Sequence, residues 1–183
     1  MNKIDAKKII LHSNNWSSFE SKILNLNENQ RGYCFELLVK LYLLTEPIYK
    51  HEFSNVWINS SFESDLPLEI KKELNLLDPD EGVDLVCKKA NSDEYVCVQC
   101  KYIGTGNNLT RNHLTSSISF CSGTETKLKE IYACSNALEK SRRLKKYTSI
   151  TYMLGNIWTS LNKESFGLIH NFLNGKTKPK ELK

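Results

Sequence analysis

Two strand-like segments at residues 82–88 and 94–102, separated by a short polar stretch, constrain the fold most strongly. β-branched and aromatic residues dominate both segments, and the Ala-Asn-Ser-Asp between them is typical of a turn, so the pair predicts an antiparallel β-hairpin. Side chains alternate between the faces of a strand, which puts Gln99 and Lys101 on one face, about 6.6 Å apart. Asp84 interrupts the apolar run of the first segment, at a position where strands disfavour aspartate.

Helices and further strands surround this hairpin in the sequence. Apolar residues repeat with helical spacing from Phe35 to Leu43 and predict a core-facing helix that ends near Pro47. Other patterns predict short helices at 4–12, 17–24 and 66–74, strands at 56–58, 131–134 and 149–154, and helices at 109–121, 138–146 and 157–173. Helices and strands that mix in this order predict an α/β fold.

Length and composition fit one domain with an appendage. The 183 residues leave no room for a second full domain, and a hydrophobic content of 40% allows a buried core. No apolar run is long enough to span a membrane, and the N-terminus lacks the apolar stretch of a signal peptide, so we expect a cytoplasmic protein without a membrane partner. Six cysteines without regular short spacing argue for reduced thiols and against a disulfide scaffold.

Positive charge is concentrated at the C-terminal end. Residues 140–183 contain 10 Lys or Arg and 2 Asp or Glu, although the whole chain carries a net charge of only +4. Basic side chains from several segments are candidates for a rim that contacts DNA phosphates: Lys88, Lys89, Arg111, Arg142, Arg143, Lys145 and Lys146. A solvated helix face is the alternative explanation for the last four.

The polar groups of the hairpin have the chemistry of a metal site. Antiparallel pairing can place Asp84 beside Gln99, so that a carboxylate, an amide carbonyl and the Lys101 ammonium share one patch. Mg²⁺ takes oxygen ligands, keeps several waters and usually has one or two protein carboxylates. Because a neutral glutamine oxygen is a weaker ligand than a carboxylate, a second acid is expected. Glu36 in the long helix is either that acid or a solvated partner of Lys40.

Several short motifs resemble a known nuclease family. They are Arg-Gly-Tyr-Cys-Phe-Glu at 31–36, Val-Trp at 56–57, Gly-Val-Asp-Leu-Val at 82–86, Val-Gln-Cys-Lys-Tyr at 98–102 and Leu-Thr at 109–110. Together they resemble the Mrr-like PD-(D/E)XK nuclease domain at the N-terminus of type ISP restriction enzymes and related phage-defence helicases, with glutamine in place of the usual glutamate of the E-x-K element. The resemblance covers roughly residues 30–160.

The resemblance implies a fold, an activity and a role for each site residue. The fold would be a restriction-endonuclease-like α/β core, with a mixed central β-sheet flanked by helices, and the activity would be metal-dependent hydrolysis of DNA phosphodiester bonds. Asp84, Gln99 and Glu36 would ligate Mg²⁺, for which Mn²⁺ would substitute. Lys101 would orient the attacking water or help to deprotonate it.

The sequence departs from the family pattern in front of Asp84. The segment at 60–77 is longer than its counterpart in the family, and Pro79-Asp80 lies four residues before Asp84 without forming an immediate Pro-Asp pair. Neither departure removes a ligand, but both leave open whether Asp80 or Glu81 also contributes.

The expected organisation is an N-terminal helical appendage at 1–28, the nuclease domain at 29–174 and a basic tail or linker at 175–183. The tail resembles a linker to a helicase or other C-terminal domain, which favours a DNA endonuclease of a restriction or phage-defence system. The alternatives are a catalytically inactive DNA-binding or docking module of the same fold, and a Holliday-junction resolvase or repair nuclease, which would require a dimer. The four histidines lack metal or triad spacing, so packing or surface roles are expected, with DNA contact by His113 as a minor alternative.

Overall fold

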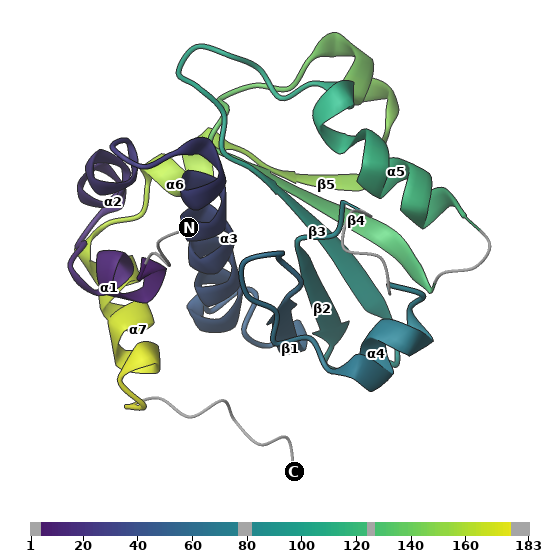
Figure 1. Ribbon diagram of the computed structural model, residues 1–183, viewed down its shortest axis with the longest axis horizontal. Helices are drawn as coiled ribbons and strands as arrows, with labels where there is room; N and C mark the ends of the chain where they lie inside the picture. Colours follow the sequence, from purple (N-terminus) through teal and green to yellow (C-terminus); the bar gives the residue numbers. More distant parts are fainter. Residues whose placement is uncertain (1–4, 77–81, 124–126, 177–183) are drawn as a thin grey trace.

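A mixed five-stranded sheet forms the centre of the computed structural model, which describes residues 5–76, 82–123 and 127–176 (Figure 1). The strands follow the order of the sequence: β1 (Phe53–Ile58), β2 (Leu85–Lys89), β3 (Tyr95–Lys101), β4 (Leu128–Ser135) and β5 (Ile150–Met153). β2 pairs antiparallel with both β1 and β3, whereas β4 pairs parallel with both β3 and β5. The predicted mixed sheet is therefore confirmed.

Helices cover both faces of this sheet (Figure 1). One face carries α1 (Ala6–Leu11), α2 (Trp16–Ile23), α3 (Glu28–Thr45), α6 (Gly155–Thr159) and α7 (Lys163–Leu173), and the other carries α4 (Leu68–Glu73) and α5 (Thr115–Ser122). Alternate residues of β3 feed the two cores: Val96 and Val98 lie in the core under α3, and Tyr95 and Cys97 in the core under α5. Because both of its faces are covered, β3 is buried over almost its whole length.

The β2–β3 hairpin forms as the sequence predicts. Leu85 pairs with Val98, and Lys88 pairs with Tyr95, so the turn lies beyond Lys89. Asp84 directly precedes β2, and Lys101 is the last residue of β3. Both polar residues therefore lie at the open end of the hairpin, away from the turn.

The predicted core-facing helix corresponds to α3, which begins earlier than the apolar pattern indicated. Asn27 and Gln30 form a capping box, in which the Asn27 side chain accepts from the Gln30 N–H (2.9 Å). Phe35 and Leu38 are fully buried against the sheet. α1 and α2 pack into the same core through residues such as Ile10 and Phe19, so the N-terminal helices are joined to the main domain by a shared core.

The basic helix expected at 138–146 is reduced to the 3₁₀ helix η2 (Arg142–Lys146). Residues before it are extended because they pair with the segment after β3: the Leu109 N–H donates to the Glu139 carbonyl (3.0 Å), and the Ser141 N–H donates to the Leu109 carbonyl (2.7 Å). The expected helix at 109–121 is likewise divided into the 3₁₀ helix η1 (Arg111–Leu114) and α5. Long-range pairing has overridden the local helical pattern.

The last helical segment is also divided, into α6 and α7. Asn162 causes the break, because its side chain accepts from the N–H groups of Glu164 (2.9 Å) and Ser165 (3.1 Å) and starts a new helix there. The six cysteines are all buried and form no disulfide. Within the part of the chain that the structure describes, no helix has the length and apolar character needed to cross a bilayer.

Candidate active site

Asp84 is held at the point where the sheet ends. Its N–H donates to the Val98 carbonyl (3.0 Å), and its carbonyl accepts from the Asn59 N–H (2.8 Å). Its side-chain Oδ2 accepts from the Cys100 N–H (2.6 Å) and from the Gln99 amide. The segment after β1 and the end of β3 thus fix both the backbone and the carboxyl group of Asp84. Asp84 lies beside Gln99, as the hairpin register predicts.

Gln99 supports Asp84 as a hydrogen-bond donor. Its side chain is buried (2% exposed), and its Nε2 donates to Asp84 Oδ2. Its Oε1 lies toward Gly82, 3.1 Å from the position that a Cβ on that glycine would take. In this orientation the amide nitrogen faces Asp84, which fits a positioning role. Metal ligation through the Gln99 carbonyl stays a prediction.

Gly82 is a site feature that the sequence analysis did not identify as such. Its φ of +70° is in the left-handed region, and a Cβ there would lie 2.6 Å from Ser116 Cβ and 2.9 Å from the Ser117 nitrogen. Only glycine therefore lets the first turn of α5 pack directly against the residues before Asp84. The signal in the sequence was the glycine at the start of a strand-like run, which often marks a close backbone approach.

Glu36 reaches the same region from α3. Burial, followed by the nearby Asp84 carboxylate, raises the pKa of Glu36 to about 8, although a Ser60 hydrogen bond and the Lys101 ammonium act in the opposite direction. Its Oε2 is buried, and no hydrogen-bond partner for it exists among the described residues. Glu36 is therefore a buried carboxyl group near Asp84, and Lys40 is paired with Asp65 instead. Ser60 is a further site residue that the sequence gave no reason to select.

Lys101 follows Gln99 by two residues on the same face of β3. Burial raises the pKa of the Asp84 carboxyl to about 6, although the Cys100 N–H hydrogen bond and then the Lys101 ammonium act in the opposite direction. In residues 5–76, 82–123 and 127–176, Lys101 forms no ion pair within 4.0 Å. The structure thus brings together all four residues that the sequence named as catalytic: Glu36, Asp84, Gln99 and Lys101.

The two carboxyl groups fit a divalent cation bound between them. Both acids have raised pKa values, and neither forms an ion pair with a basic side chain of the described residues. Mg²⁺ takes ligands of this kind. The described residues contain no group of three His, Cys, Asp or Glu side chains that could hold a metal ion. Two carboxylates are nevertheless enough for Mg²⁺, because this ion retains several waters. Asp80 and Glu81 lie outside the described residues.

The predicted DNA-contacting residues fall into two groups. Lys88 and Lys89 lie at the turn end of the hairpin, about 13 Å and about 17 Å along β2 from Asp84. Both are already paired, Lys88 with Asp93 (3.5 Å) and Lys89 with Glu130 (2.6 Å). The structure therefore does not place these two lysines in a rim around the site.

The other basic residues lie in the two connections that leave the site end of the sheet. η1 follows β3 and η2 follows β4, and these parallel strands both end at the edge that carries Lys101. Arg111 in η1 donates through Nε to the Tyr147 hydroxyl (2.8 Å), directly after η2. The remaining basic residues all belong to η2: Arg142, Arg143, Lys145 and Lys146.

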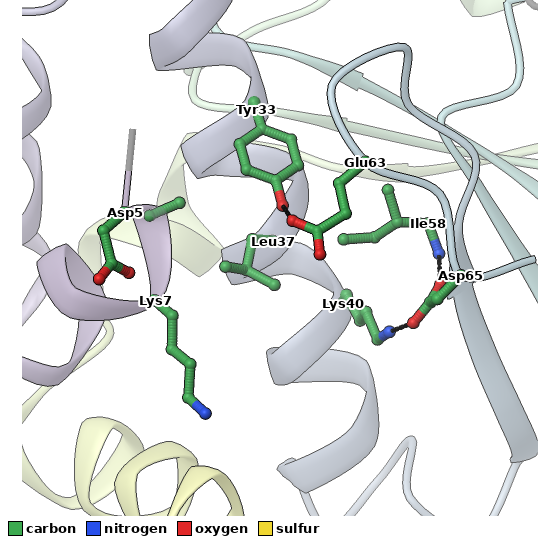
Figure 2. A pocket seen from close by; sticks show the side chains of 9 residues that line it. Asp5, Lys7, Tyr33, Leu37, Lys40, Ile58, Glu63 and Asp65 are labelled. Carbon is green, nitrogen blue, oxygen red and sulfur yellow. Dashed lines mark hydrogen bonds and ion pairs between the residues drawn. The ribbon is translucent and has the colours of Figure 1, made fainter. Parts of the chain in front are cut away.

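A separate pocket of about 490 Å³ lies between the start of α1, α3 and the segment after β1 (Figure 2). Tyr33 donates from its hydroxyl to Glu63 (2.9 Å), and Lys40 is paired with Asp65. Figure 2 shows these two pairs on its wall with Leu37 between them. The pocket is lined by neither Asp84 nor Glu36, and its wall charges on α3 are already matched.

Comparisons with known proteins identify the family and the fold. The family model Mrr_cat_2, described as Restriction endonuclease, matches residues 44–147, a span that contains Asp84, Gln99 and Lys101. A solved structure titled "ATP-dependent Type ISP restriction-modification enzyme LlaBIII bound to DNA" is similar, with a TM-score of 0.58 and 18% identity over 81% of this chain. This chain spans 9% of the LlaBIII chain. The search of curated proteins found no match. The fold and family expected from the sequence motifs are confirmed.

Proposed function

Because this chain belongs to the Mrr-type restriction endonuclease family, we propose that the cluster around Asp84 is the active site of a Mg²⁺-dependent DNA endonuclease, in which Mn²⁺ can replace Mg²⁺. The family match supports the nuclease part of this proposal. One observation carries the metal-dependent part: Glu36 and Asp84, from different layers of the fold, lie close enough for one carboxylate to raise the pKa of the other. Shared coordination of a cation would remove that repulsion.

Each residue has a defined task in this proposal. Asp84 and Glu36 hold the cation, which when bound polarises the scissile phosphate and acidifies a coordinated water. Asp84 does not have to reorganise, since Cys100 and Gln99 already fix its carboxyl group. Gln99, named from the sequence as a third ligand, keeps Asp84 in place.

Lys101 supplies the positive charge at the end of β3. It orients the water that attacks phosphorus and offsets the negative charge that develops on the phosphate oxygens. Its charge is available for this task because no carboxylate of the described residues lies within ion-pair distance. The task requires the ammonium to face the phosphate, on the same face of β3 as Gln99.

The substrate in this proposal is DNA, bound along the edge that carries Lys101. Arg111 and the basic residues of η2 lie in the connections that leave that edge and would contact phosphates on either side of the scissile bond. Lys88 and Lys89 take no part. A helicase or other domain that follows this chain would move or present the DNA. The LlaBIII neighbour, an ATP-dependent enzyme bound to DNA, supports this proposal.

Plasmid nicking tests the proposed function. The wild-type chain should convert supercoiled plasmid to open circles with Mg²⁺ or Mn²⁺ and should be inactive with EDTA. Asp84→Asn should be at least about 1000-fold slower, because it removes the charged ligand but keeps the shape of the side chain. Calorimetric titration with Mn²⁺ gives a second readout, in which the variant should lose most of its metal affinity.

Different outcomes separate this proposal from its rivals. DNA binding by the wild-type chain without nicking under any divalent ion would support the inactive docking module. Nicking confined to branched DNA by a sedimenting dimer would support the resolvase. Equal nicking by the wild type and Asp84→Asn would reject the assignment of the site.

A further inference from the structure

His113 lies at the junction of η1 and α5, and two contacts place this junction at the site. The first turn of α5 packs on Gly82, where Ser116 and Ser117 leave no space for a Cβ. Burial lowers the pKa of His113, and the nearby Lys101 ammonium lowers it further. His113 is therefore the titratable neighbour of Lys101 on the α5 side of the sheet.

The hydrogen bonds of His113 assign its tautomer. The Thr110 N–H donates to His113 Nδ1 (3.0 Å), and the Thr110 hydroxyl lies 3.2 Å from the same nitrogen. A backbone N–H can only donate, so Nδ1 must present a lone pair, and the single proton of the neutral ring is on Nε2. Among the described residues, Nε2 has no hydrogen-bond partner. The ring thus has a donor of fixed orientation that the fold itself does not use.

We propose that His113 is a substrate-contacting residue whose Nε2–H donates a hydrogen bond to a non-bridging oxygen of the DNA phosphate bound at Lys101. This inference rests on the proposed function and adds a third group to it. A neutral donor is suited to this position, because it binds the phosphate without placing a second positive charge beside Lys101. Thr110 is then a positioning residue, since its N–H holds the ring in the required tautomer.

The competing explanation is purely structural. Thr110 and His113 form a capping box at the start of η1, and capping alone would account for the Nδ1 contact. The two explanations use different ring nitrogens. Capping requires the acceptor Nδ1, whereas phosphate contact requires the donor Nε2–H.

Two amide substitutions separate the roles of the two nitrogens. His113→Asn can put Oδ1 where Nδ1 is, so it keeps the cap and removes the Nε2 donor. His113→Gln can put its NH₂ group where Nε2 is, so it keeps the donor and removes the cap. Single-turnover cleavage with Mg²⁺ and thermal unfolding should be measured for both variants beside the wild type and Asp84→Asn.

We expect His113→Asn to cleave about 10- to 100-fold more slowly with an unchanged melting temperature, the loss of one hydrogen bond to a charged group. His113→Gln should retain cleavage to within about threefold even where its melting temperature falls. Nitrogen-15 NMR of the wild type should show the Nε2–H tautomer. Wild-type cleavage by His113→Asn, or losses in both variants that follow the melting temperature, would overturn the inference while Asp84→Asn remains inactive. An inactive wild type would instead reject the proposed function, and this inference with it.

Discussion

The two ends of the β2–β3 hairpin differ in whether their charged side chains form ion pairs. At the turn end, Lys88 and Lys89 are matched by acidic partners, with Lys89 between Glu94 (3.3 Å) and Glu130 (2.6 Å). At the open end, the carboxyl groups of Glu36 and Asp84 have raised pKa values, to about 8 and about 6. The same two strands thus carry compensated charges at one end and carboxyl groups that lack a close cation at the other.

This difference separates residues that stabilise the fold from residues that lower the free energy of unfolding. Ion pairs at the turn end are partly exposed, and such pairs contribute up to about 1 kcal/mol each. Two buried acids that lie close together lower the stability of the folded state at neutral pH, and the fold itself does not require such a pair. A role in binding a cation explains why these acids occur at the open end. Matched substitutions at the two ends of the hairpin test this explanation.

The largest effect on nicking should come from removing the charge of Lys101 at the open end, with Lys89 at the turn end as the matched control. Lys101→Met keeps the length of the side chain and removes its charge, so Mg²⁺-dependent nicking should fall at least about 1000-fold. Lys89→Met makes the same chemical change at the turn end and should leave nicking within about twofold of the wild type. Plasmid nicking measures both. Similar losses in the two variants would mean that Lys101 acts through stability rather than at the site.

The pH dependence of the unfolding free energy tests whether the buried Glu36 carboxyl lowers the stability of the protein. Because Glu36 holds its proton more strongly in the folded state than its ordinary pKa of 4.5 allows, stability falls as pH rises from about 4.5 to about 8. Glu36→Gln mimics the protonated acid, so it should match the wild type near pH 4 and exceed its unfolding free energy by about 4 kcal/mol at pH 8. Urea unfolding at the two pH values gives the comparison. A constant difference between variant and wild type would place Glu36 outside a charged cluster.

The smallest effect should come from the basic residues near the site. Arg142→Gln combined with Arg143→Gln should weaken DNA binding about tenfold and reduce the slope of log affinity against log salt by roughly 2. Each phosphate contact that is lost reduces the number of counterions that binding releases from the DNA. Lys88→Gln combined with Lys89→Gln removes equal charge at the turn end and serves as the matched control. Titration of a labelled duplex over a salt series measures both slopes. Equal slopes for the two double variants would show that only net charge matters.

The hairpin was predictable because its signals are local. The turn residues set the register, and the register alone places Asp84 beside Gln99. Glu36 needed more: its place near the apolar stripe left two interpretations open, and the family resemblance favoured the one that the structure supports. The roles of these residues in chemistry remain predictions.

Other features depend on contacts that local patterns cannot reveal. The basic helix expected at 138–146 is shortened by backbone pairing with Leu109, a residue about thirty positions earlier. Ser60 and His113 enter the site through the fold of their segments rather than through any motif. The sequence alone could have separated Lys88 and Lys89 from the site, because each residue of β2 after Asp84 lies about 3.3 Å farther from that aspartate.

The assembly of the site from three separated segments has a consequence during protein synthesis. α3 supplies Glu36, the residue before β2 supplies Asp84, and the last residue of β3 supplies Lys101. A nascent chain on the ribosome therefore has an incomplete set of these groups until Lys101 has left the exit tunnel and paired with its neighbours.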